Sequence, residues 1–170
     1  MKIVKFFYEK INNKPAPYYY DYSLVAIIKK PLRKYFTNVV AAHCPFNFLR
    51  IFIYRLCGFK IGKHCFIGMC SYLDDMCYDL LVIGNNVTVS YGVFFACHGK
   101  DQKHLPIVIE DDVYIGMRAN LISKNTDKDN GITIGKGAVI GAGSLVNKNV
   151  PAGATAVGVP CKILAKSRAS

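Results

Sequence analysis

The sequence has 170 residues, which is the length of one domain with a small appendage. Hydrophobic residues make up 52% of it and charged residues 19%, and this excludes a wholly disordered chain. The net charge of +11 would suit a nucleic-acid-binding protein, but it is unevenly distributed. Residues 1–60 carry eleven basic and two acidic side chains, whereas residues 61–170 carry eleven basic and nine acidic ones. Because the larger part is nearly neutral and lacks a repeating basic stripe, we do not expect nucleic acid as a partner.

The first predicted unit, residues 1–57, is a basic and apolar helical segment. Prolines keep its helices short, at positions Pro15, Pro17, Pro31 and Pro45. One role for such a segment is to cap the open end of the domain that follows. The other is peripheral contact with an anionic membrane surface, made by basic side chains that lie beside exposed aromatic ones: Lys29, Lys30, Arg33, Lys34, Arg50 and Arg55. The two roles are compatible if they use different faces.

The cysteine content indicates a reducing compartment. The seven cysteines are odd in number, and no two of them have CxxC spacing. The first residues lack the apolar core of a signal peptide, so we expect free thiols in a cytoplasmic protein, at the inner face of the membrane if the basic segment docks there. The four histidines and the cysteines lack the spacing of metal ligands, so no metal is expected. No apolar stretch of about 20 residues is free of charge, so no transmembrane helix is expected.

The second predicted unit, residues 58–164, contains a six-residue period, and residues 165–170 form a tail. From Ile61 onward an aliphatic residue opens each hexad, glycine often follows it, and a small or slim residue stands at the fifth position. Twelve hexads fall into four groups of three, and only Phe95 opens a hexad without being aliphatic. The groups cover residues 61–78, 83–100, 109–126 and 134–151.

A period of six matches neither a helix nor the simple alternation of a strand. Six residues can form a short strand and a corner, so three hexads close one triangular coil of 18 residues. The aliphatic residue then points inward, a small fifth residue fits beside it, and glycine at the second position suits the corner. Cys65 and Cys77 stand at fifth positions and are expected to fill the interior. The sequence therefore predicts an all-β solenoid, a parallel β-helix of about four or more coils, with loops between the groups.

Several segments resemble the hexapeptide-repeat acyltransferases: IGNNV, IEDDVYIG, ITIGKGAVIGAGSLVNKNVP and the ending VGVPCKI. The likeness covers about residues 58–164 and is strongest to the branch that contains the sugar, capsule and lipopolysaccharide O-acetyltransferases. It implies a left-handed β-helix, a homotrimer with active sites between its subunits, and acetyl-CoA as the acetyl donor.

The resemblance places the general base at His98. In the family this histidine follows a coil and precedes the strand that reads IGxxVWIG, and here His98 precedes an eight-residue excursion and then IEDDVYIG. An alcohol is a poor nucleophile, and an imidazole, with its pKa of about 6.5, suits removal of the hydroxyl proton. Cys97 and His98 are neighbours on an extended segment and should point to opposite sides. We therefore expect direct attack by the acceptor, without an acyl-cysteine intermediate.

Three further residues are candidates for the acceptor side. Asp74 and Asp75 resemble the paired acids of the sugar O-acetyltransferases, and Asp75 would either hold a sugar hydroxyl or orient His98. His104 lies in the excursion that follows His98 and competes with it. The acceptor-side asparagine of the family would fall at Ile67 here, and this departure argues against a galactoside or maltose acceptor.

The resemblance also indicates where the donor would bind, at Tyr114, Met117, Ala142, Asn147, Lys148 and Lys162. Tyr114 stands where relatives carry an aromatic residue against the pantetheine arm. Lys148 and Lys162 suit the phosphates of coenzyme A as point charges. The later arginine of the family falls at Ala165 here, with Lys166 next to it.

These features predict an enzyme that moves an acetyl group from acetyl-CoA to a hydroxyl of a carbohydrate, in the biosynthesis of a cell-surface polysaccharide. A sugar amine or an antibiotic hydroxyl is the alternative acceptor. Two alternatives belong to other functional classes. The first is a β-helix of the γ-carbonic-anhydrase type, which would need three histidines around zinc. The second is a non-enzymatic scaffold, which would cleave no thioester and would not need His98.

Overall fold

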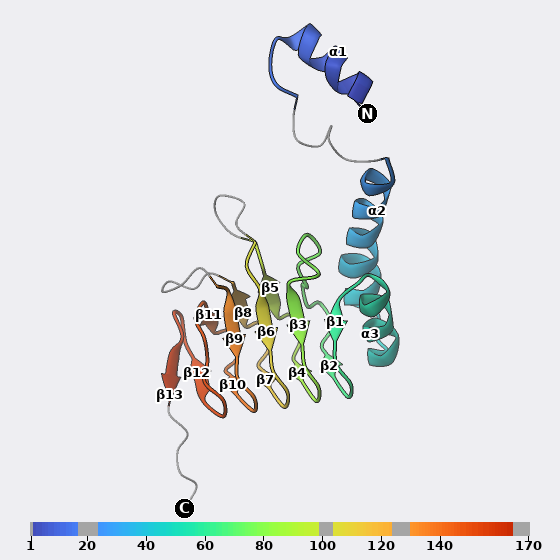
Figure 1. Ribbon diagram of the computed structural model, residues 1–170. Helices are drawn as coiled ribbons and strands as arrows, with labels where there is room; N and C mark the ends of the chain where they lie inside the picture. The colour runs from blue at the N-terminus through green and yellow to red at the C-terminus, as the bar shows by residue number, and fades with distance from the viewer. Residues whose placement is uncertain (1, 17–23, 99–103, 124–129, 165–170) are drawn as a thin grey trace, which may run out of the picture.

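The computed structural model describes residues 2–16, 24–98, 104–123 and 130–164. Helices come first in the chain and strands follow, stacked coil upon coil (Figure 1). The helices are α1 (Lys2–Asn12), α2 (Leu24–Tyr35), the π-helix η2 (Phe36–Ala41), which continues α2, and α3 (Asn47–Leu56). None of the helices among these residues is long and apolar enough to cross a membrane.

The strands form three sheets, which are the three sides of a solenoid. The first sheet contains β1 (Lys60–Ile61), β3 (Leu81–Ile83), β6 (Ile107–Ile109) and β9 (Ile132–Ile134). The second contains β2 (Phe66–Ile67), β4 (Thr88–Val89), β7 (Tyr114–Ile115), β10 (Val139–Ile140), β12 (Thr155–Val157) and β13 (Lys162–Leu164). The third contains β5 (Phe94–Ala96), β8 (Asn120–Ile122) and β11 (Leu145–Val146). Neighbouring strands run parallel except β13, which is antiparallel to β12.

The interior of the solenoid follows the hexads. Among the described residues, every first position except Ile61 is buried, and every fifth position is buried as well. Cys65, at a fifth position, fills the interior as predicted, and Cys77 is buried as well, although it lies in the loop that leaves the coil after Leu73. Gly99 and Asn125, also at fifth positions, lie outside the described residues. The parallel β-helix predicted from the period of six is therefore confirmed.

The repeated glycines have a different role from the one predicted. The corners turn at the fourth position, where φ is positive even for side-chain-bearing residues such as Asn86 (55°) and Arg118 (54°). The second-position glycines lie where one coil approaches the next. A Cβ on Gly62 would lie 2.3 Å from the carbonyl oxygen of the next coil, and one on Gly116 would lie 2.5 Å from a backbone nitrogen. Glycine is needed there because it allows close stacking of the coils.

Helix α3 covers the open end of the first coil. Its Tyr54 is fully buried in the core of the solenoid. Its Arg50 is also buried, and the Nε of this side chain donates to the carbonyl oxygen of Ile67 at 2.6 Å. The Asn47 amide donates to the carbonyl oxygen of Cys65 at 3.0 Å and accepts from the N–H of Ile67 at 3.0 Å. These bonds satisfy backbone groups of β2 that would otherwise end the sheet unpaired.

Candidate active site

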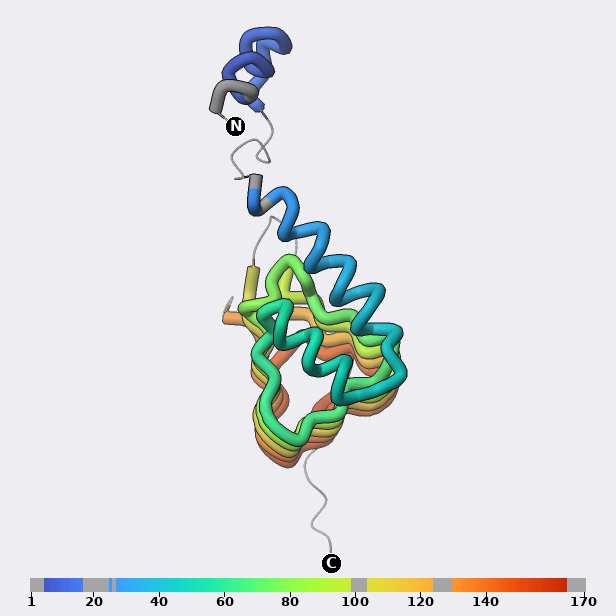
Figure 2. The backbone as a smooth tube through the Cα atoms, turned by 90° about the vertical axis from the view of Figure 1, so that its right-hand side faces the viewer, coloured from blue at the N-terminus to red at the C-terminus, as the bar shows by residue number. Residues whose placement is uncertain are grey.

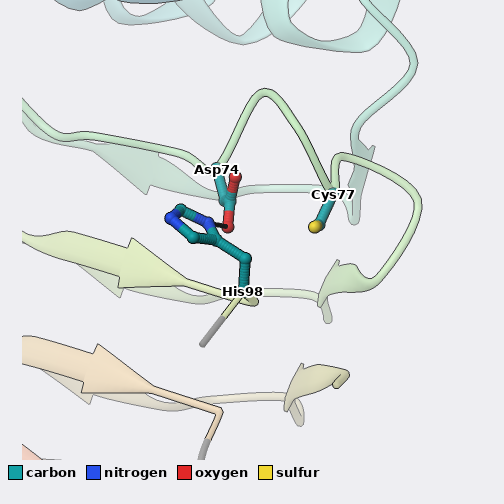
Figure 3. Close-up of side chains that lie close together, drawn as sticks. All are labelled: Asp74, Cys77 and His98. Carbon is teal, nitrogen blue, oxygen red and sulfur yellow. Dashed lines mark hydrogen bonds and ion pairs between the residues drawn. The ribbon is translucent and has the colours of Figure 1, made fainter. Parts of the chain in front are cut away.

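Two interruptions of the repeat bring side chains together along the third side of the solenoid. After Leu73 the chain leaves the coil in a loop over residues 74–80, and after His98 it leaves the next coil. A parallel bridge between Tyr72 and Phe94 fixes the register of the two coils, so the loop that begins at Asp74 lies beside the end of β5. The side chains of Asp74, Cys77 and His98 point toward one another there (Figure 3).

The central contact joins Nδ1 of His98 to Oδ2 of Asp74 at 2.6 Å. The Asp74 side chain is fully buried, whereas 38% of the His98 side chain is exposed. The same carboxylate accepts the N–H of Cys97 at 2.8 Å and that of Met76 at 3.1 Å. An ionised carboxylate only accepts hydrogen bonds, so Nδ1 carries the proton and Nε2 keeps a lone pair. In Figure 3 the second ring nitrogen points away from Asp74.

Cys97 belongs to the buried core whereas the His98 side chain is partly exposed, which agrees with the predicted divergence of the two neighbours. The Cys97 side chain is fully buried. Burial, with a smaller contribution from Asp74, raises the pKa of this thiol far above its ordinary value. Because the thiolate is the reactive form, the buried, protonated thiol of Cys97 is a poor nucleophile at neutral pH.

Asp74, Cys77 and His98 also offer ligand-type atoms that all lie within 4.8 Å of one another. Nδ1 of His98 and Oδ2 of Asp74 are in direct contact, which leaves no space for an ion between them. Burial and the nearby aspartates raise the pKa of the Cys77 thiol to about 11, so it is protonated at neutral pH. The donor set therefore fits a carboxylate–imidazole pair better than a metal centre. His64 lies at the corner between β1 and β2, away from the His98 corner that follows β5, so the two do not form a shared zinc site.

The structure gives the paired aspartates different partners. Asp74 lies behind His98 and both of its oxygens accept hydrogen bonds, so its contacts fit the orienting role that was considered for Asp75. Asp75 is 8% exposed, and its Oδ1 accepts the amide of Asn38 at 3.0 Å and the hydroxyl of Tyr72 at 3.4 Å. Burial and the two carboxylates raise the pKa of Tyr72, so its hydroxyl stays protonated as a donor.

Sequence reasoning gave no role to Asn38, and no pattern pointed to it. Asn38 lies in η2, and 37 residues separate it from its partner Asp75. For Asp74 the sequence contains one weak signal. Asp74 occupies the second position of its hexad, and the two preceding hexads have glycine at that position. Glu110 is also an acid at a second position but lies exposed at a corner, so the position in the hexad does not by itself predict a buried acid.

His104 lies directly beside His98 through the backbone. The two residues form an antiparallel bridge, and the N–H of Leu105 donates to the carbonyl oxygen of Cys97 at 2.8 Å. The His104 side chain is exposed. The predicted excursion thus leaves and rejoins the coil at one point, with both histidines at its base, while residues 99–103 lie outside the described residues.

The predicted donor-binding residues fall into separate places within one chain. Asn147 and Lys148 follow β11 and are half-buried, at the end of the same sheet as His98. Met117 and Ala142 are exposed at another corner, after β7 and β10, where the N–H of Gly143 donates to the carbonyl oxygen of Met117 at 2.9 Å. Tyr114 is 47% exposed on β7, and Lys162 is exposed on β13. A single chain therefore does not bring all of these positions to His98.

Comparisons with known proteins identify what the repeats and the fold are similar to. Residues 106–148 match the family described as "Hexapeptide repeat of succinyl-transferase". The chain is 38% identical to the serine acetyltransferase of Bacillus licheniformis over 112 residues, which are 65% of this chain and 47% of the relative. It is 40% identical to the 2,3,4,5-tetrahydropyridine-2,6-dicarboxylate N-acetyltransferase of Staphylococcus aureus over 81 residues, which are 48% of this chain and 31% of the relative.

Among solved structures, the maltose O-acetyltransferase of Clostridium difficile is similar, with a TM-score of 0.57, 25% identity, and coverage of 84% of this chain and 88% of that one. The chain spans half or less of the length of the two curated relatives above, and the similarity to them rests on the repeats. The hexads, the three-sided solenoid and these matches together show hexapeptide repeats in the fold of the hexapeptide-repeat acetyltransferases, the left-handed parallel β-helix.

Proposed function

We propose that this protein transfers an acetyl group from acetyl-CoA to a hydroxyl of a carbohydrate. The observation that carries the proposal is the pair formed by the buried Asp74 carboxylate and Nδ1 of the half-exposed His98, 2.6 Å apart. This arrangement fixes the imidazole in the tautomer that can accept a proton at Nε2. Burying a carboxylate costs desolvation free energy. A buried acid paired with a surface histidine therefore indicates a function for the pair, and fixing the tautomer and orientation of the imidazole is such a function.

The pair suits a single proton-transfer cycle. Bound acetyl-CoA supplies the acetyl group as a thioester. Nε2 of His98 takes the proton of the acceptor hydroxyl while the hydroxyl oxygen bonds to the thioester carbonyl carbon. The carbon–sulfur bond then breaks, and the leaving thiolate takes the proton from Nε2. Asp74 holds the ring throughout and stabilises the imidazolium that forms between the two steps.

The acceptor class rests on the resemblance and on the names of similar proteins. A carbohydrate hydroxyl is supported by the likeness to sugar O-acetyltransferases, one of which, a maltose O-acetyltransferase, shares the fold over 84% of this chain. The relatives that are named as serine and amine acetyltransferases favour other acceptors for the same chemistry. We place the reaction in cell-surface polysaccharide biosynthesis, with an amine acceptor as the alternative.

We further propose a homotrimer in which each active site lies between two subunits. The support is the separation within one chain of Met117 and Ala142 from His98, since a neighbouring subunit can supply the missing positions. Large apolar side chains are exposed on the flanks of the solenoid as well, among them Phe66 at 47% and Met117 at 55%. Light scattering after gel filtration would then give three times the chain mass of 18.9 kDa.

The test is a thiol-release assay with acetyl-CoA and a panel of acceptors: neutral sugars, amino sugars, serine and glycan intermediates. We expect release with at least one sugar hydroxyl acceptor and its loss in His98→Ala, by about 10³-fold. His104→Ala is the matched control, because it changes the other histidine at the base of the same excursion.

The outcomes separate the levels of the proposal. Release with serine or an amine alone would overturn the carbohydrate acceptor and leave acetyl transfer standing. Full activity in His98→Ala would remove the proposed base. Loss of activity in His104→Ala, with His98→Ala active, would move the role to the competitor.

A further inference from the structure

The helical segment has a large apolar surface that faces away from the solenoid. On α2 and η2, exposed apolar residues recur at helical spacing, with 45–61% of each side chain accessible: Val25, Ile28, Leu32, Tyr35, Phe36 and Val39. On α3 the exposed apolar residues are 38–74% accessible: Phe48, Leu49, Phe52 and Leu56. We call these two stripes together the outer helical face. Contiguous apolar surface of this kind marks an interaction site, unlike single exposed residues.

A groove joins the two stripes. It has a volume of about 490 Å³ and lies between the α2–η2 helix and the end of α3. Phe36 and Leu56, which belong to the two stripes, line it together with Lys29 and Arg33. The Arg33 guanidinium lies over the ring of Tyr78, 3.7 Å from its centroid. The groove is thus apolar with cations at its side, a combination that suits an anionic amphiphile.

The charge of this segment is of one sign. Residues 24–60 contain seven lysines and arginines and no aspartate or glutamate. Lys29 and Lys34 are exposed on α2 between the apolar positions. Amphipathic helices with lysines and arginines beside exposed phenylalanine and leucine are typical of surfaces that lie in the interfacial region of a membrane.

The outer helical face also has the placement that docking requires. Viewed along the solenoid, α2 and α3 are the elements nearest the viewer in Figure 2, and β13 lies at the opposite end of the stack in Figure 1. The face therefore occupies one end of the molecule, where a flat surface can meet it without contacting the coils.

We propose that the outer helical face docks on an anionic phospholipid bilayer. Charge complementarity favours this occupant over a second copy of the chain, because two such faces would place lysines and arginines against each other. Helix α1 has the same character, with Phe6, Phe7 and Ile11 exposed. The η2 residue Asn38 bonds Asp75 in the loop beside His98, so a docked helical segment holds the candidate active site next to the bilayer.

The experiment is vesicle flotation of the full chain without acetyl-CoA. The vesicles are phosphatidylcholine alone, or an equal mixture of phosphatidylcholine and phosphatidylglycerol. We expect binding to the mixed vesicles, which high salt reverses. The variant Ile28→Glu/Phe52→Glu removes apolar contacts from both stripes and should bind about tenfold more weakly or worse. Leu164→Glu, at the opposite end of the solenoid and 51% exposed, is the matched control and should bind as the wild type does.

Several results would overturn the proposal. Binding to neither vesicle would remove the bilayer, and equal binding of Ile28→Glu/Phe52→Glu would transfer docking to another part of the chain, such as α1. If gel filtration shows that this variant dissociates an oligomer, the face is instead an interface between copies. The His98→Ala variant should bind vesicles normally, so failure of docking and failure of the proposed chemistry are distinguishable.

Discussion

The solenoid and the helical segment use apolar residues in opposite ways. In the solenoid the period of six turns them inward, and Ile67, Val89 and Leu121 are completely buried. In the helical segment Phe48 and Leu56 are more than 70% exposed, although the segment is just as apolar. In a repeat, the apolar residues of one coil are buried against the next coil. The helical segment caps only one coil, so the apolar residues on its other faces remain exposed and available to a binding partner.

The candidate site lies where these two regions meet. His98 and Asp74 stand at interruptions of the repeat, and Asp75 of the same loop bonds Asn38 of η2. Regular coils bring few catalytic side chains together, because their inner positions are apolar and their corners repeat the same pattern. The irregular loop supplies the buried carboxylate of Asp74, and the neighbouring coil supplies the histidine.

The largest effect is expected from Asp74→Asn, which tests whether the irregular loop carries the chemistry. An amide can donate to Nδ1, so it would favour the tautomer with the proton on Nε2, which cannot act as a base. We expect kcat to fall by about 10³-fold with the KM for acetyl-CoA unchanged. The control is Asp112→Asn, which changes an exposed acid at a corner of the solenoid and should keep full activity. A kcat within a few-fold of wild type would show that Asp74 does not set the tautomer.

Stacking of the solenoid is tested by Gly116→Ala, because a Cβ there would lie 2.5 Å from the backbone nitrogen of Ala142. The coils would have to separate locally, and we expect the free energy of unfolding in urea to fall by about 3 kcal/mol. The control is Gly137→Asn, at a corner with φ +66° and open space around it. Asparagine tolerates that conformation, so a cost below about 0.5 kcal/mol is expected. Equal costs at the two positions would contradict the stacking explanation.

The joint between the two regions is tested by Arg50→Met. The change keeps an apolar stem but removes the bonds to the carbonyl oxygens of Ile67 and Cys44. We expect a loss of about 2 kcal/mol in the free energy of unfolding and faster hydrogen exchange in β2. Arg55→Met is the control, because this exposed residue bonds carbonyl groups that water can also reach. If Arg50→Met left exchange in β2 unchanged, α3 would not be protecting the first coil.

The sequence was sufficient to predict the solenoid because the signal is redundant. Each hexad repeats the inward position, so one odd residue such as Phe95 does not hide the period. The role of the glycines could not be read in the same way, since a glycine allows both a positive φ and a close approach. Only the contact between Gly62 and the next coil separates these two reasons.

The site was less predictable because its contacts are long-range and not periodic. The resemblance assigned the general base to His98 but left open which task each of the two aspartates has. Asp74 and Asp75 are adjacent in sequence, yet one faces His98 and the other faces Asn38. Which way each side chain turns depends on the path of the loop over residues 74–80, and no pattern in the sequence specifies that path.

The smallest effect is expected from Asn38→Ala, which tests whether the helical segment acts on the site or merely covers a coil. The change removes the 3.0 Å bond to Asp75, and we expect the free energy of unfolding to fall by about 1 kcal/mol. Asn120→Ala is the control, because that amide makes an exposed bond of 3.3 Å within its own coil. A double-mutant cycle with Asp75→Ala should give a coupling energy of about 1 kcal/mol, and acetyl transfer should fall in step with it. If the stability changes of the two single variants simply add in the double variant, η2 and the loop are in contact but not energetically coupled. The helical segment and the solenoid would then be coupled only through α3.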